Sequence, residues 1–203
     1  MPRSTLRRAL CAGALCLTVT VATPAAADAA KVGVAAKRLN IKAGSRVTVK
    51  GRADAPGTVK LQVQRRGRWA TIDRDRTDAR GRYVLRARVT APLSGRARVK
   101  TSSGARRTIG RVNVYRSALA SWYGPGLYGN NLACGGRLYP GRLGVANKSL
   151  PCGTMVTFRH RGRVVRVPVI DRGPFAGGRE YDLTQATAQK LGWPGPGAIQ
   201  ATR

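Results

Sequence analysis

The sequence has few acidic residues, a single histidine and few aromatic residues. Its 203 residues contain 8 Asp and Glu against 38 Lys and Arg, and 5% are aromatic. The histidine, His160, lies between Arg159 and Arg161 near an expected turn, and no cysteine neighbours it. A zinc site of Cys and His ligands therefore cannot be assembled. We expect no metal and no cofactor, and we predict that His160 is a solvated turn residue.

The sequence also lacks an apolar run long enough to cross a bilayer. The run 9–22 holds about 14 residues, whereas a spanning helix needs ~20. It follows a basic N-terminus and precedes small residues at 25–27, a pattern typical of a secretory signal peptide. We predict that residues 1–29 are a signal peptide and that the mature protein is secreted, without stable membrane insertion.

Loss of the signal peptide leaves two of the four cysteines. Cys11 and Cys16 lie in the apolar run, so Cys134 and Cys152 are the pair that stays. In an exported chain, an even pair of cysteines without companion metal ligands favours a disulfide. We therefore predict a Cys134–Cys152 bridge.

The charge of the chain is strongly one-sided. The formal net charge is +30, and about +27 is left once the signal arginines are removed. Residues 28–116 carry 24 basic and five acidic residues, and residues 117–203 carry 11 and three. For an exported protein, this charge favours anionic wall polymers as partners, and we expect no nucleic acid. The alternative is a solvated basic surface with no specific partner.

Residues 30–116 have the pattern of a β-sandwich. Short runs of alternating polar and apolar residues, separated by turn residues, indicate antiparallel strands with one buried face. These runs span 45–51, 57–64, 69–72, 81–89, 95–100 and 109–115. The pattern resembles immunoglobulin-like modules of exported proteins and contains no catalytic constellation. We predict hairpin tips at 65–68 and 78–81 and a short linker at 115–119.

The segment 117–203 carries more specific motifs. The run 164–170 is apolar and β-branched, which is typical of a strand buried in a small barrel, and it ends at Asp171. A carboxylate at the mouth of a barrel is a candidate catalytic acid. The alternative is that Asp171 caps the turn or pairs with Arg172 or Arg179.

A short helix is predicted after Asp182. Thr184 is its expected N-cap, Ala188 and Leu191 fall on one face, and Gly192 ends it. Asp182 lies just before this helix, where it either accepts structural hydrogen bonds or contacts a ligand.

Five motifs together resemble the double-psi β-barrel of rare lipoprotein A and its expansin-like relatives. They lie at 120–126, 133–136, 144–156, 164–175 and 178–184. The resemblance covers nearly all of 117–203 and none of 31–115. It implies an all-β chain, in which the sandwich is followed by a six-stranded double-psi barrel with one or two short helices. It also implies action on the glycan strands of peptidoglycan, in the manner of a septal-ring lytic transglycosylase.

In that reaction one acid protonates the glycosidic oxygen, and the muramyl 6-hydroxyl attacks to leave a 1,6-anhydro end. The resemblance assigns the acid to Asp171. Aromatic rings stack on sugars, although each could instead belong to the core. We predict as glycan-binding residues Trp122, Tyr123, Tyr139, Asn147, Arg172, Phe175 and Asp182.

Three positions depart from the rare lipoprotein A pattern. Gly136, Tyr139 and Asn147 stand where those enzymes typically carry glutamate, aspartate and histidine. The two late cysteines, each followed by glycine, instead resemble the expansin-like branch, whose members loosen walls without demonstrable bond cleavage. Two functions stay open for a wall-associated monomer, a lytic transglycosylase and a non-catalytic peptidoglycan-binding module. A nucleic-acid-binding or protein-inhibitor module is a third, resting on charge alone.

Overall fold

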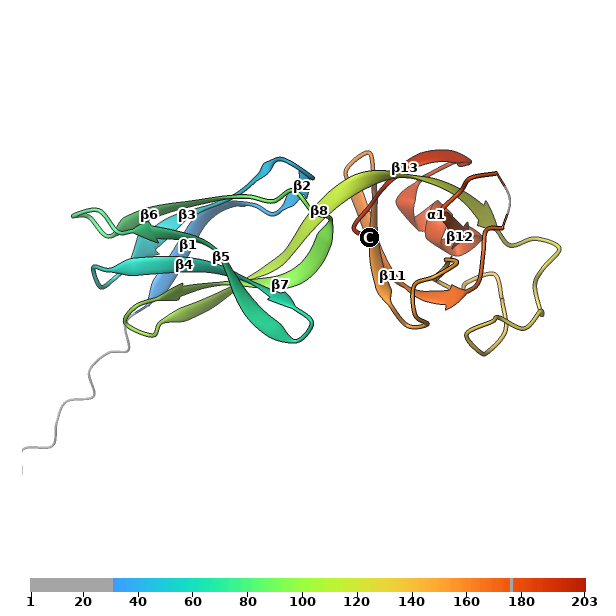
Figure 1. Cartoon of the computed structure of the whole chain (residues 1–203), viewed down its shortest axis with the longest axis horizontal. Helices are drawn as coiled ribbons and strands as arrows, with labels where there is room; N and C mark the ends of the chain where they lie inside the picture. Colours follow the sequence, from blue (N-terminus) through green and yellow to red (C-terminus); the bar gives the residue numbers. More distant parts are fainter. Residues whose placement is uncertain (1–30, 176) are drawn as a thin grey trace, which may run out of the picture.

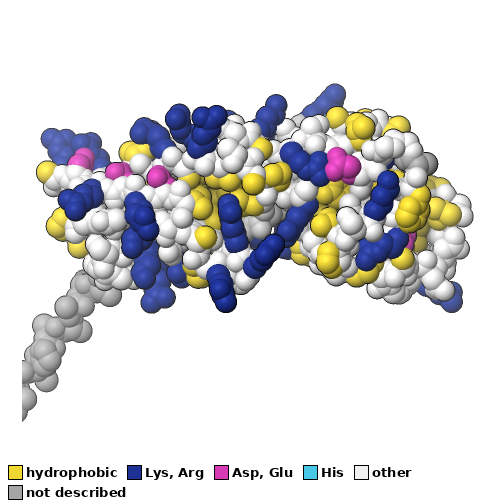
Figure 2. All heavy atoms as spheres, in the orientation of Figure 1, with side chains coloured by type: hydrophobic (Ala, Val, Ile, Leu, Met, Phe, Trp, Pro, Cys, Tyr) yellow, Lys and Arg dark blue, Asp and Glu magenta, His cyan; other side chains and the backbone are white. Residues whose placement is uncertain are grey.

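The computed structural model describes residues 31–175 and 177–203, so the predicted signal peptide lies outside the described residues. The chain forms two lobes joined by one long strand (Figure 1). Lys and Arg side chains are spread over both lobes and across their junction on the face shown in Figure 2. No helix in the described ranges is long and apolar enough to cross a membrane.

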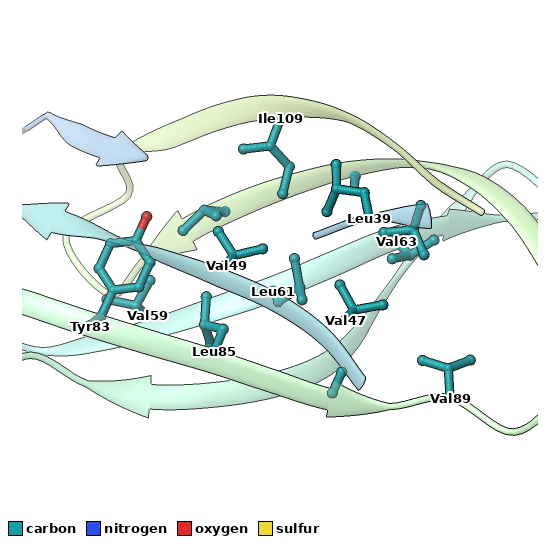
Figure 3. Packing of buried hydrophobic residues seen from close by; sticks show 14 of the residues in the cluster. Leu39, Val47, Val49, Val59, Leu61, Val63, Tyr83, Leu85, Val89 and Ile109 are labelled. Carbon is teal, nitrogen blue, oxygen red and sulfur yellow. The ribbon is translucent and has the colours of Figure 1, made fainter. Parts of the chain in front are cut away.

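The N-terminal lobe consists of two sheets, which we call the sandwich. The smaller sheet is antiparallel and has the order β1 (Val32–Arg38), β3 (Arg46–Ala53), β6 (Arg82–Arg88). The second sheet has the order β8 (Arg106–Tyr123), β7 (Leu93–Thr101), β4 (Thr58–Arg65), β5 (Arg68–Arg76), and β2 (Asn40–Lys42) pairs with β8 in parallel. The two sheets enclose one apolar core (Figure 3).

Alternation of side chains along the strands builds this core. On β3, Val47 and Val49 are fully buried while Arg46 and Lys50 face solvent. Each of the six alternating runs read from the sequence lies on a strand, because burying one face of each strand removes its apolar side chains from water. The all-β prediction is confirmed, and the immunoglobulin-like classification stays a prediction.

One of the two predicted hairpin tips is a hairpin. Arg66 and Gly67 have φ of 47° and 79°, the left-handed pair that a two-residue turn between β4 and β5 requires. At 78–81 the hairpin prediction is wrong. The chain does turn there, but β5 and β6 belong to different sheets.

Acidic side chains replace the missing backbone pairing between β5 and β6. The carboxylate of Asp75 accepts the backbone N–H of Val84 at 2.6 Å, and Asp73 accepts that of Arg86. These bonds satisfy donors on the open edge of β6, which would otherwise invite another strand. Asp73 and Asp75 therefore help to close the sandwich along this edge.

The predicted linker at 115–119 is wrong. β8 is one strand of 18 residues that pairs with β7 in the sandwich and with β13 in the second lobe. Tyr115 is 1% exposed and Ala118 is 3% exposed, so the strand has buried side chains on both sides of the junction, whereas Ser117 between them is exposed. No glycine or proline interrupts the segment, and β8 continues through it without a turn.

The C-terminal lobe is a closed barrel of six strands, which we call the barrel. In addition to the second half of β8, its strands are β9 (Val145–Ala146), β10 (Met155–His160), β11 (Arg163–Asp171), β12 (Tyr181–Thr184) and β13 (Gly197–Ala201). The order is β12-β9-β11-β10-β13-β8, and a parallel pairing of β12 with β8 closes the ring. Phe158 and Tyr181 pack edge to face in its core, with ring centroids 5.1 Å apart. The predicted six-stranded barrel is confirmed.

Helix α1 (Gln185–Leu191) forms where the sequence predicted a short helix, and it packs on the barrel. The Thr184 side chain accepts the N–H of Thr187 at its start, and Gly192 ends it in the left-handed conformation, with φ of 60°. Ala188 and Leu191 are buried against the barrel core.

Candidate functional site

Asp171 lies on the rim of the barrel, as the last residue of β11. It directly follows Val169 and Ile170, which are buried. Its Oδ1 accepts the backbone N–H groups of Ala133 and Arg172, each at 2.9 Å. A buried strand on one side and two backbone donors on the other therefore fix the position of this carboxylate.

Asp171 belongs to a row of residues that crosses four neighbouring strands. In strand register, Asp171 on β11 pairs with Ala146 on β9, Ala146 pairs with Asp182 on β12, and Asp182 pairs with Ser121 on β8. Two strand spacings separate the backbones of the two aspartates, which is about 10 Å. The small side chain of Ala146 lies between them.

The environment of Asp182 differs from that of a solvated aspartate. It is half-buried, and its Oδ1 accepts the hydroxyl of Ser121 at 2.7 Å. Burial raises the pKa of the Asp182 carboxyl, the Ser121 hydrogen bond and the charge of Arg179 oppose this, and the negative charge of Asp171 adds to the rise.

Tyr123 completes the group at the end of β8. Within the described ranges its hydroxyl is buried and has no hydrogen-bond partner. Burial raises the pKa of Tyr123, and the charges of Asp171 and Asp182 and the closeness of its hydroxyl to the Asp171 carboxylate raise it further, although no well-aligned hydrogen bond joins the two groups. The phenol therefore stays protonated across the physiological range. Asp171, Asp182, Tyr123 and Ser121 form what we call the rim cluster.

Two of the predicted glycan-binding side chains are engaged within the protein. The Asn147 amide donates to the carbonyl of Glu180 at 2.9 Å and accepts the N–H groups of Ser149 and Leu150. The Arg172 guanidinium donates to the carbonyls of Asn147 and Leu150 and to Sγ of Cys152. Both side chains hold the loop beside Asp171, and their contact with glycan stays a prediction.

The predicted disulfide between Cys134 and Cys152 is present, with the Cα atoms 5.5 Å apart. It joins the loop that follows β8 to the loop that precedes β10. The N–H of Cys134 also donates to the carbonyl of Ile170 at 3.2 Å. Because Ala133 precedes Cys134, the bridge fastens the backbone donor that holds Asp171.

The predicted aromatic residues divide into two groups. Trp122, Tyr139 and Phe175 are 39%, 51% and 81% exposed, which leaves their rings accessible to a ligand. Trp122 is also fixed by a hydrogen bond from its indole N–H to the carbonyl of Pro194. Tyr123 lies in the rim cluster instead.

No sequence signal identifies Ser121, since its partner Asp182 is 61 residues away and is brought close only by the parallel pairing of β12 with β8. The prediction for His160 is wrong. It is the last residue of β10, half-buried, and its Nδ1 is buried without a hydrogen-bond partner among the described residues. No group of three or more candidate metal ligands occurs in those same ranges.

Comparisons with known proteins concern the C-terminal part of the chain. Residues 116–202 match the family model described as "Lytic transglycolase". The probable endolytic peptidoglycan transglycosylase RlpA of Synechocystis is 43% identical over 98 residues, which cover 47% of this chain and 29% of that protein. That of Aquifex aeolicus is 40% identical over 87 residues, covering 42% and 38%.

The chain therefore spans 29% of the length of the Synechocystis relative and 38% of the length of the Aquifex relative. Among solved structures, a Streptomyces papain inhibitor is similar over 44% of this chain and 94% of its own, with 26% identity and a TM-score of 0.34.

Proposed function

We propose that the C-terminal barrel, an RlpA-like double-psi β-barrel, cleaves the glycan strands of peptidoglycan as an endolytic transglycosylase. One observation carries this proposal. Asp171 is held on the barrel rim by two backbone N–H groups, in one strand row with a second carboxylate, Asp182. The match of residues 116–202 to the lytic transglycolase model supports the same reaction class.

A single acid is sufficient for this chemistry. Asp171 gives its proton to the glycosidic oxygen as the bond to the anomeric carbon breaks. The muramyl 6-hydroxyl attacks that carbon and passes its proton to the Asp171 carboxylate, which restores the acid. No water is consumed, unlike in glycosidases that hydrolyse the bond with two carboxylates.

The other groups of the site would bind and orient the strand. Asp182 is an acceptor for sugar hydroxyls, whereas the hydroxyl of Tyr123 is buried and would support the rim from within. The exposed rings of Trp122, Tyr139 and Phe175 offer apolar faces on which sugar rings stack. Pre-positioned groups of this kind favour catalysis because little ordering is needed after binding.

A second function, a wall-binding module without cleavage, is favoured by the environment of Asn147. The amide at this position does not titrate, and backbone groups of the neighbouring loop occupy it. Gly136 and Tyr139 supply no carboxylate either. In this case the same rim would hold glycan and loosen the wall without breaking a bond.

Digestion of purified, peptide-stripped glycan strands, followed by mass spectrometry of the products, separates the two functions. Three proteins are compared: the mature protein, Asp171→Asn, and Asp54→Asn as a control for loss of an acidic charge on the sandwich. A transglycosylase yields anhydro ends with the mature protein and the control but not with Asp171→Asn.

Binding of the same proteins to sacculi is measured in parallel by pulldown. Retained binding without products from any protein favours the binding module. Absence of both binding and products contradicts both functions.

We also propose that 30–116 and 117–203 are separate domains of a monomer that is secreted and associated with the cell wall. The two distinct hydrophobic clusters, one in the sandwich and one in the barrel, support this division.

A further inference from the structure

A hollow of 520 Å³ lies where the sandwich meets the barrel. Its walls come from β1 and β2 on one side and from β13, the end of β10 and the turn between β10 and β11 on the other. Its lining includes no Asp or Glu. The cationic side chains that line it are Arg38, Lys42, Arg159 and Arg161.

Two further hollows adjoin this one and share lining residues with it. A hollow of 390 Å³ shares Arg38 with it and adds Arg46 and Arg88. A hollow of 320 Å³ shares Lys42 with it and adds Arg116. Neither has a carboxylate in its lining. We call the three hollows together the junction groove.

Most of the charge in the junction groove is uncompensated. Two ion pairs occur among residues 31–175 and 177–203, and only one involves a groove residue, the pair of Arg116 with Glu180. The other six cations of the groove repel one another, which costs stability unless an anion is present. Arg159 is also held in place, since its guanidinium lies 5.9 Å from the ring centroid of Tyr115.

One residue of the same hollow also carries a polar atom without a partner. His160 lines it, and Nδ1 of this residue is buried without a hydrogen-bond partner among the described residues. A buried polar atom without a partner costs about 1–3 kcal/mol, so such atoms are normally satisfied by a protein group, water or ligand.

We propose that the junction groove binds a linear polymer of phosphodiesters, of the polyol-phosphate kind found in cell walls. Guanidinium groups match the oxygens of a phosphate in a bidentate manner. A polymer with charges in its backbone can place successive phosphates against successive cations along the groove.

The lining argues against single-stranded nucleic acid as the occupant. Sequence-tolerant binding of single strands uses aromatic rings on which bases stack. The linings of the three hollows include no Trp or Phe, and their one tyrosine, Tyr115, is 1% exposed, while the half-buried imidazole of His160 is the other ring. The groove therefore fits a polyanion without bases.

This site is distinct from the rim cluster. β11 begins at Arg163, next to the turn that lines the groove, and ends at Asp171 on the rim. Eight residue steps along a strand span about 26 Å. The chain would then hold an anionic polymer at one end of the barrel and glycan at the other, which raises the strength of attachment to a wall containing both.

Binding of purified polyol-phosphate polymer, measured by isothermal titration calorimetry at two salt concentrations, tests the proposal. Poly-glutamate and oligo-dT of matched charge are the competing ligands. The groove variant combines four substitutions, Arg38→Gln, Lys42→Gln, Arg159→Gln and Arg161→Gln. The control removes the same charge from exposed positions elsewhere on the sandwich by Arg65→Gln, Arg68→Gln, Arg74→Gln and Arg106→Gln.

We expect the groove variant to bind the phosphate polymer at least tenfold more weakly and the control to lose less than threefold. The slope of log K against log salt should fall by about 3 in the groove variant, since each phosphate contact on a flexible chain contributes about 0.7. Circular dichroism and thermal melting establish that both variants fold.

Equal losses in the two variants would mean that net charge alone binds the polymer, which overturns the proposal. So would tighter binding of poly-glutamate or oligo-dT than of the phosphate polymer. Glycan cleavage is assayed separately on the same variants, and its presence or absence does not alter these outcomes.

Discussion

The bridge between Cys134 and Cys152 should carry a large share of the stability of the barrel. It joins residues 18 positions apart. Closing a loop of this length removes about 11 cal/mol/K of chain entropy from the unfolded state, or about 3 kcal/mol at 25 °C. The double variant Cys134→Ala/Cys152→Ala should lose that amount of unfolding free energy.

The melting temperature gives the simplest readout. A loss of 3 kcal/mol corresponds to about 12–24 °C if the barrel unfolds by itself, and to about 6–12 °C if the whole chain unfolds in one step. Melting is followed by circular dichroism, with and without dithiothreitol. The reductant should lower the melting temperature of the parent protein and leave the double variant unchanged.

The bridge should also affect the rim. It fastens the loop whose Ala133 N–H holds Asp171, so the double variant should lose activity or glycan binding below its own melting temperature. A fall in melting temperature of less than 2 °C would refute the entropic argument. Full retention of glycan processing would refute the link to Asp171.

Three further predictions concern single side chains. Tyr123→Phe removes a buried hydroxyl without a partner, so urea unfolding should show a gain of about 1 kcal/mol, and a loss of that size would contradict the geometry. Gly144→Ala places a Cβ 2.2 Å from Cδ1 of Ile170 and should lower the free energy of unfolding by about 1–3 kcal/mol in the same assay. The control Gly141→Ala, whose Cβ meets nothing closer than 3.8 Å, should lower it by less than about 0.5 kcal/mol. Hydrogen bonds from Arg116 lower the pKa of Glu180 from its usual 4.5. The pair therefore stabilises the fold above that pH, and this contribution is lost as the pH falls through the pKa of Glu180 in the folded state. Because the pair is partly exposed, Glu180→Gln should remove less than about 1 kcal/mol at pH 7 and nothing at pH 2, as judged from melting at a series of pH values.

The predictions for 115–119 and 78–81 failed because both depend on how strands assemble into sheets. At 115–119 two patterns with different motifs meet, which predicts a linker, yet β8 runs through the segment as one unbroken strand. At 78–81 the turn residues were identified correctly, but a turn does not determine which sheet the next strand joins. Hydrogen bonds from β6 to Asp73 and Asp75 depend on that choice.

Within the rim cluster, the sequence located Asp171 because its strand and the following turn are local features. The relation of Asp171 to Asp182 is not local, since it runs through Ala146 on a two-residue strand that no periodicity could indicate. Asn147 was identified as an altered position from the motif, and only the folded chain shows that its amide holds the neighbouring loop.

The sequence by itself determined the all-β class, most strand positions, the helix with its caps, the disulfide pair and the carboxylate at the end of β11. Each of these follows from local propensity, side-chain alternation or simple pairing. The tertiary structure decided the row of two aspartates and a serine, the buried state of Tyr123, and the junction groove that joins cations from β1, β2 and the β10–β11 turn. Ser121 and Asp182 are 61 positions apart, and the closeness of the residues in each of these features depends on strand order and barrel closure, which no local pattern encodes.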